Sequence, residues 1–187
     1  GDMGVYASDL ESTGLLNQMA VQENPKLHNL CSIAIDSDEV VLIEGSRRKD
    51  IQNWLNQGHT FIMHNCYTYD MPALEFLGYD VSKTKFIDSL ALSWYLEPQR
   101  MQHGLAAYGE EFGVKKPKIE NWEEQTQEEY NHRVLEDCRI QKRLWQKQVG
   151  RLQELYGKEP GSFDRLVKYL MWKMQCLRMQ QDNKVKL

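Results

Sequence analysis

Short apolar and alternating stretches dominate the first half of the chain and predict a β-sheet. Residues 5–11 alternate with a period of two, which predicts a strand with Val5, Ala7, Asp9 and Glu11 on one face. Further strands are expected at residues 30–35, 39–44, 60–63 and 86–87. A short polar turn at residues 36–38 separates two of them, so the first three strands are expected to run antiparallel in succession.

Helical spacing of apolar residues takes over in the second half. The pattern predicts helices at residues 48–58, 69–77, 88–95, 104–112 and 128–155. Asp88 is expected to cap the third of these, and Pro72 fits the second only within its first turn. Strands first, followed by strands mixed with helices, predict an α/β fold with a mixed sheet flanked by helices.

The segment Gly-Lys-Glu-Pro-Gly at residues 157–161 is typical of a linker. It divides a domain at residues 1–156 from a tail at residues 157–187, where residues from Ser162 onward predict an amphipathic helix. Two interpretations of this helix stay open. It packs on the same domain, or it begins a further region and presents an apolar stripe to another subunit.

Composition and charge restrict the function. The 187 residues are 41% hydrophobic, enough for one core, and the net charge of −4 gives no general attraction to nucleic acid. The four cysteines form no metal-binding pattern and indicate reduced thiols. No apolar run is long enough for a membrane span and no signal peptide opens the chain, so a cytoplasmic protein without a membrane partner is expected.

Three groups of polar residues suggest chemistry. Asp9 and Glu11 share a strand face, where two carboxylates repel each other unless a cation lies between them. Asn65 and Asp70 follow a buried strand, and Asp137 lies among apolar helix positions, where an unpartnered carboxylate is costly. Each residue alone also fits an ordinary structural role as an edge, turn or helix-end residue.

Their order resembles a known family. Residues 9–15, 65–70 and 132–137 are similar to the three motifs of the DEDD (DnaQ-like, ribonuclease H-fold) exonuclease superfamily. Residues 64–65, 69–74, 87–90 and 103–109 look more specifically like the proofreading domain of podophage A-family DNA polymerases. The resemblance covers roughly residues 5–150 and implies a ribonuclease H-like, mixed five-stranded sheet.

The resemblance also implies an activity. Asp9, Glu11, Asp70 and Asp137 would hold two Mg²⁺ or Mn²⁺ ions that catalyse hydrolysis of the terminal phosphodiester. Nucleoside 5′-monophosphates would leave from single-stranded DNA 3′ ends, in the service of a polymerase domain or subunit in the host cytoplasm if a phage encodes the chain. Contacts to the terminal nucleotide are expected from Leu10, Thr13, His64 and Asn65.

A further family residue is the group that orients the attacking water. Some members place a tyrosine four residues before the last aspartate, where this chain has Arg133, and others place a histidine five residues before it, where this chain has His132. The resemblance therefore implies a histidine-type site with His132 as general base. A regular helix would turn His132 roughly 140° away from Asp137. An irregular or mobile turn is therefore expected around His132.

Two other functions remain open. One is a free-standing exonuclease for RNA or short oligonucleotides, and the other is a non-catalytic, polymerase-associated binding module; the presence of all four carboxylates argues against the second. Single-strand binding needs basic and stacking side chains. Candidates for these are Lys115, Lys116, Lys118, Tyr67, Tyr69, Tyr108 and Trp122.

Overall fold

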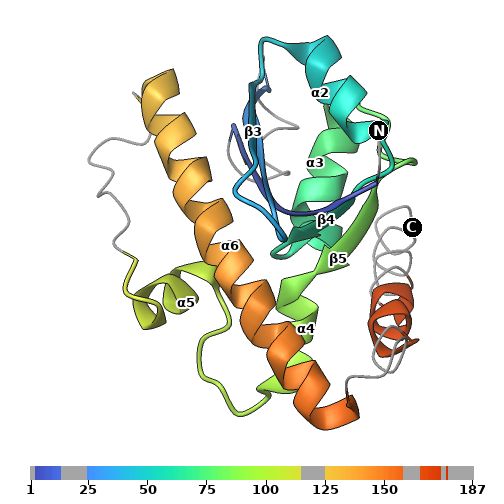
Figure 1. Cartoon of the computed structure of the whole chain (residues 1–187). Helices are drawn as coiled ribbons and strands as arrows, with labels where there is room; N and C mark the ends of the chain where they lie inside the picture. The colour runs from blue at the N-terminus through green and yellow to red at the C-terminus, as the bar shows by residue number, and fades with distance from the viewer. Residues whose placement is uncertain (1–2, 14–24, 115–124, 158–164, 174–175, 177–187) are drawn as a thin grey trace, which may run out of the picture.

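A five-stranded mixed sheet forms the centre of the molecule (Figure 1). The structure is a computed structural model and describes residues 3–13, 25–114, 125–157, 165–173 and 176. The strands lie in the order β3-β2-β1-β4-β5. Their bounds are β1 Val5–Ser12, β2 Leu27–Ala34, β3 Val40–Glu44, β4 Thr60–Met63 and β5 Lys85–Asp88. The first three are antiparallel, and β4 and β5 run parallel to β1. The expected mixed α/β sheet of the ribonuclease H-like fold is thus confirmed.

Helices cover both faces of this sheet. The long helix α6 (Gln127–Tyr156) crosses one face diagonally, while α2 (Arg48–Leu55) and α3 (Met71–Phe76) lie on the other side (Figure 1). The helices α4 (Ser89–Leu96) and α5 (Leu105–Glu111) lie near the C-terminal half of α6. None of the helices in the described residues is long and apolar enough to cross a membrane.

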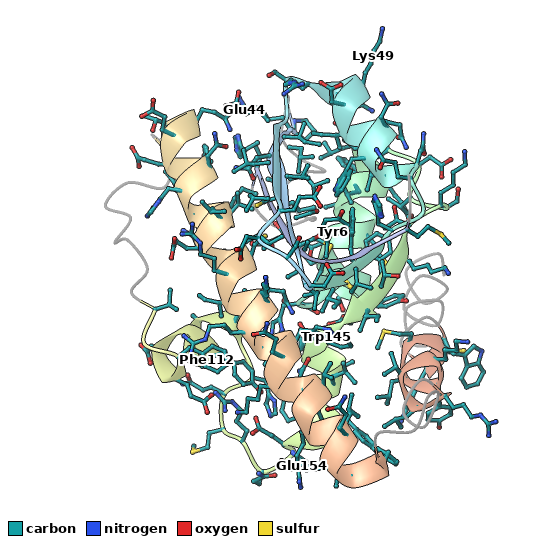
Figure 2. All side chains as sticks on the ribbon, in the orientation of Figure 1. Tyr6, Glu44, Lys49, Phe112, Trp145 and Glu154 are labelled. Atoms are coloured by element: carbon teal, nitrogen blue, oxygen red, sulfur yellow. The ribbon has the colours of Figure 1, made fainter. Side chains whose placement is uncertain are left out.

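The alternation along β1 decides what each face contacts. Tyr6 points toward α2, where its ring meets the edge of Trp54 at a centroid distance of 5.0 Å (Figure 2). The opposite face, which carries Asp9, packs against α6 through a small cluster that joins Cys31 of β2 to Cys138 of α6. Because successive side chains of a strand point to opposite faces, the two carboxylates of β1 both face α6.

The segment after β4 departs from the single helix expected at residues 69–77. A π-helical turn, η1 (Cys66–Asp70), comes first, and α3 follows with Pro72 in its first turn. Asn65 begins this turn with a left-handed φ of 65°, a conformation that asparagine tolerates better than most residues. Such π turns occur frequently at functional sites, and this one carries Asp70.

A tail helix at residues 165–173 lies beside β5 (Figure 1). Its Val167 and Met171 are buried in the same hydrophobic cluster as Trp145 of α6. The Asp88 backbone N–H donates a 3.2 Å hydrogen bond to the Met171 sulfur, so the tail helix covers part of an edge strand. The division of the chain at residue 156 stays a prediction, since most of the linker, residues 158–164, lies outside the described residues.

Candidate metal centre

Three carboxylates from two elements meet on the α6 face of the sheet. Asp9 and Glu11 come from β1, the central strand, and Asp137 comes from the middle of α6. One carboxylate oxygen from each of the three residues lies within 4.8 Å of the oxygens offered by the other two. Residues 128 positions apart in the chain therefore form one compact oxygen cluster, which suits a hard divalent cation.

Asp70 adds a fourth carboxylate. It ends η1, is 4% exposed, and lines the same cavity as the other three. Within the part of the chain that the structure describes, its Oδ2 is buried and has no hydrogen-bond partner. A buried carboxylate oxygen in this condition is costly, and a bound cation would remove the cost.

The cavity between these residues measures about 220 Å³ and is open to solvent on one side. Its wall contains most of the predicted catalytic and contact residues, the stacking candidate Tyr69 and, in addition, Leu105. The lining residues are Asp9, Leu10, Glu11, His64, Asn65, Tyr69, Asp70, Leu105 and Asp137. Thr13 is described but does not line this cavity; it bonds instead to the backbone of Lys26.

The electrostatics of the cluster demand positive charge. Burial, followed by the charges of Asp137, Asp70 and Glu11, raises the pKa of Asp9 well above its usual value. Burial, then the charges of Asp88 and Glu11, likewise raises the pKa of Asp70. Without a cation, these carboxyl groups therefore hold their protons to a higher pH than isolated carboxyl groups do. Divalent cations would take the place of these protons, so the residues fit a metal centre.

One cation of the chain itself reaches this cluster. The Arg133 Nε lies 3.1 Å from the Glu11 Oε1, and both side chains are largely buried. Arg133 stands one helical turn before Asp137 and therefore on the same side of α6. The family motif identifies position 133 only as the place where some members have a tyrosine. The signal for its contact with the carboxylates is the spacing, since a basic residue four positions before Asp137 lies on the same side of a helix.

We expect the substitution Arg133→Gln to tighten divalent metal binding a few-fold. The guanidinium is paired with Glu11, so a metal must displace it before that carboxylate can bind, and its positive charge also repels the cation. Calorimetric titration with Mn²⁺ measures the change. Arg139→Gln, which removes the exposed ion pair of α6 with Glu136, is the matched control and should leave the affinity unaltered. Weaker Mn²⁺ binding in Arg133→Gln alone would show that Arg133 supports the site instead of competing with the metal.

His132 occupies a different place from the one that a general base needs. Residues 127–156 form one continuous α-helix, so the irregular turn expected around His132 is absent there and that expectation was wrong. His132 is exposed and does not line the cavity. The physical reason is that Thr126 caps α6 before this point by accepting a hydrogen bond from the Glu129 N–H, so helix geometry already holds at His132.

His64 forms part of the cavity wall as a neutral imidazole. Its Nε2 donates to the His103 carbonyl at 2.7 Å, and its Nδ1 is 2.8 Å from the Ser89 hydroxyl. Burial lowers the pKa of His64 to about 4. His64 therefore cannot supply a positive charge to a phosphate at neutral pH, and it serves to join β4 to the start of α4 and to the loop before α5.

The structure confirms the predicted role of Asp88 as the cap of α4. Asp88 also holds the backbone behind the cavity. Its Oδ1 accepts from the N–H of Leu90 at 2.9 Å and from the N–H of Asn65 at 2.8 Å. A longer contact of 3.4 Å reaches the Tyr67 N–H. One fully buried carboxylate thus holds both the N-terminus of α4 and the turn that leads to Asp70.

We expect Asp88→Ala to lower the free energy of unfolding by about 1–2 kcal/mol, as for loss of a helix cap. It should also reduce metal affinity, because the η1 turn loses its anchor. Urea unfolding and Mn²⁺ titration provide the measurements. Asp80→Ala, which removes an exposed carboxylate that is hydrogen-bonded within its own loop to Ser82, is the control. A stability equal to that of the control would contradict the anchoring role.

The aromatic residues expected to stack on bases divide into three groups. Tyr67 and Tyr108 are buried in the interior, so their assignment to a binding surface was wrong; sequence proximity to charged loops did not reveal which way they point. Tyr69 lines the cavity, and its hydroxyl lies 3.2 Å from the Ser12 hydroxyl. Trp122 and the lysines at positions 115, 116 and 118 lie outside the described residues.

Comparisons with known proteins agree on the fold. No family model and no curated protein sequence matches the chain. Among solved structures, a nuclease in its apo form is similar with a TM-score of 0.65 and 19% identity, covering 96% of this chain and 86% of that one. NrnC of Brucella melitensis is similar with a TM-score of 0.63 and 16% identity, covering 95% and 87%. Identities this low show the fold alone.

Phi29 DNA polymerase is similar over a part of its length. The match has a TM-score of 0.54 and 13% identity, and it covers 81% of this chain but 32% of the polymerase. The chain therefore has the fold that nucleases and one region of a DNA polymerase share, built around a carboxylate cluster. The more specific resemblance to podophage polymerases stays a prediction.

Proposed function

We propose that this chain is a metal-dependent 3′→5′ exonuclease that releases nucleoside 5′-monophosphates from nucleic-acid ends. The observation that carries the proposal is the convergence of Asp9, Glu11 and Asp137 within 4.8 Å, with Asp70 on the wall of the same cavity. Two Mg²⁺ or Mn²⁺ ions bound there would supply a nucleophilic hydroxide and stabilise the charge of the displaced oxygen. NrnC has also been solved with bound Mg²⁺.

The remaining cavity residues are suited to hold the end of a strand. Leu10 and Asn65 both line the cavity beside the carboxylates, although most of the Leu10 side chain is buried in the main hydrophobic cluster. The cavity of about 220 Å³ is open, so a strand can enter from solvent with its terminal phosphodiester near the acidic cluster. We include Leu10, His64 and Asn65 in the proposed contact surface. Thr13 could join them only through a movement of the segment after β1.

His132 remains our prediction for the water-orienting residue, under one condition. Because the side chain is exposed on regular helix, the first turns of α6 must rearrange before it can approach the cavity. A pH–rate profile that is the same for His132→Ala and wild type would remove His132 from the mechanism. A profile that loses one ionisation near neutral pH would support the rearrangement.

Two substrates follow from different observations. The sequence motifs favour DNA 3′ ends and proofreading beside a polymerase domain. A second candidate, a free-standing enzyme for short oligonucleotides, follows from the similarity of the fold to NrnC. NrnC has been solved bound to pGG, which is a property of that protein and a guide to the choice of substrates here.

The test uses 5′-labelled DNA and RNA, as a dinucleotide, a hexanucleotide and a longer strand, with Mg²⁺ or Mn²⁺. Shortening from the 3′ end that stops on addition of a chelator supports the enzyme. Faster removal of mismatched than of matched duplex ends supports proofreading, and preference for the dinucleotide supports the second candidate. If neither metal permits degradation of any substrate, the proposed function fails and a non-catalytic binding module becomes the better interpretation.

A further inference from the structure

Trp94 of α4 exposes a large aromatic surface to solvent. It is 56% exposed, whereas Trp54 and Trp145 are both buried in the main hydrophobic cluster. An indole contributes more apolar area than almost any other side chain, so leaving it exposed forfeits considerable burial energy. Packing of α4 therefore does not account for a tryptophan at this position.

Although exposed, the indole is held in place on one face. The His103 ring stacks on it with a centroid distance of 3.8 Å and an interplanar angle of 23°. His103 itself is buried, and its Nδ1 lies 2.6 Å from the Ser93 hydroxyl. One face of the Trp94 indole is thus covered by the His103 ring, and the solvent-exposed area lies on the remainder of the indole.

The same support connects Trp94 to the carboxylate cavity. The His103 carbonyl accepts the 2.7 Å hydrogen bond from His64, which lines the cavity. Leu105, two residues farther along, lines it as well. Trp94 is therefore linked to the cavity through two residues, His103, which stacks on the indole, and His64, which bonds to His103 and lines the cavity.

We propose that Trp94 is a stacking platform for a nucleobase of the strand whose 3′ end enters the carboxylate cavity. The proposal rests on the proposed function and extends it from the terminal nucleotide to an upstream one. A rigid, half-exposed indole accepts the face of any base, so recognition is independent of sequence. Because the chain carries a net charge of −4, general attraction to phosphate contributes little and stacking becomes more important for holding the strand.

Kinetics with strands of two lengths test this platform. Trp94→Leu should raise the KM for a single-stranded hexanucleotide by about 5- to 150-fold, the range that corresponds to loss of one base–aromatic stack. The increase should be smaller for a dinucleotide, which has no upstream base to stack. Trp94→Phe, which keeps an aromatic ring, should recover most of the affinity. Trp172→Leu removes a comparable indole, 59% exposed on the tail helix, and should match wild type.

A binding measurement complements the kinetics. Addition of the hexanucleotide to the Asp9→Asn variant should quench tryptophan fluorescence, and the quenching should be reduced in Asp9→Asn/Trp94→Leu but retained in Asp9→Asn/Trp172→Leu. Thermal unfolding of the Trp94 variants checks that the fold is kept.

Several results would overturn the platform. One is equal KM values for wild type and Trp94→Leu. Another is a loss of the same size for both strand lengths, which would assign the effect to the cavity wall through His103. A third is a change in oligomeric state with unchanged strand binding, which would make Trp94 a protein interface. If wild type degrades neither strand, the proposed function fails. The fluorescence measurement then tests strand binding at Trp94 independently of hydrolysis, and the absence of quenching would contradict the platform as well.

Discussion

Asp9→Asn is expected to slow the release of nucleotides by at least about 10³-fold. The amide cannot supply the negative oxygen that a divalent cation requires at the centre of the cluster, and such a cation contributes several kcal/mol of transition-state stabilisation at 1.36 kcal/mol for each factor of ten. Asp9 is the residue to change because it interacts with all three other carboxylates. Single-turnover hydrolysis of a 5′-labelled strand measures the effect.

Asp38→Asn is the matched control for this substitution. Asp38 is exposed in the turn between β2 and β3, so loss of its charge should leave the rate close to that of wild type. If Asp9→Asn retained activity within tenfold of the control, the carboxylate cluster would not be the catalytic centre. Asp137→Asn should behave like Asp9→Asn, because Asp137 supplies an oxygen to the same group.

Without metal, the carboxylate cluster is expected to make the stability of wild type fall, relative to Asp9→Asn, as the pH rises. The pKa values of Asp9 and Asp70 are raised in the folded state above the ordinary aspartate value of 3.8, so these groups hold protons in the folded chain that the unfolded chain has already released. Between that value and the raised folded pKa values, folding is linked to proton uptake and the free energy of unfolding decreases with increasing pH. Above the raised pKa values, the carboxyl groups of the folded chain are ionised and their mutual repulsion is complete.

Thermal unfolding in a chelator from about pH 4 to about pH 8 measures this slope. Mg²⁺ or Mn²⁺ at 100 times its dissociation constant should then stabilise wild type by about 2.7 kcal/mol at neutral pH. Asp9→Asn should be more stable than wild type in the chelator at neutral pH and should lose most of the stabilisation by metal. His64, whose pKa is lowered to about 4, gives the opposite slope in wild type and variant alike, so the difference between the two proteins is the measurement. A metal-free wild type whose stability relative to Asp9→Asn does not fall with rising pH would contradict the raised pKa values.

Most of the sheet could be predicted from local patterns. The alternation of residues 5–11 predicts that Asp9 and Glu11 share one face of a strand, and the structure confirms this. The register of β1 is fixed because the strand is buried on both sides, so a shift by one residue would exchange its faces. Asp88 was recognisable as a cap, since a carboxylate just before a helical pattern accepts orphan N–H groups. The order of the strands, in contrast, was not predicted by periodicity, and the family resemblance implied only a mixed five-stranded sheet.

Errors occurred where a side chain's direction depends on distant partners. Tyr67 and Tyr108 were expected to stack on bases but are buried, whereas Trp94, for which the sequence predicted no role, is exposed. An aromatic residue at a helical position carries no local sign of which neighbours will cover it. His132 was likewise placed by its spacing from Asp137, although regular helix geometry turns it toward solvent.

By itself, the sequence determined the elements of this protein, the face of β1 that carries two carboxylates, and an ordered set of acidic motifs that resembles an exonuclease family. These features depend on spacing along the chain, which a periodic pattern records directly. Only the tertiary structure decided that Asp137 joins Asp9 and Glu11 within 4.8 Å, that Arg133 contacts Glu11, and that Asp88 anchors the turn behind Asp70. Such contacts arise from the packing of α6 and β5 against the central strands, and packing brings together residues whose separation in sequence carries no information about their distance in space.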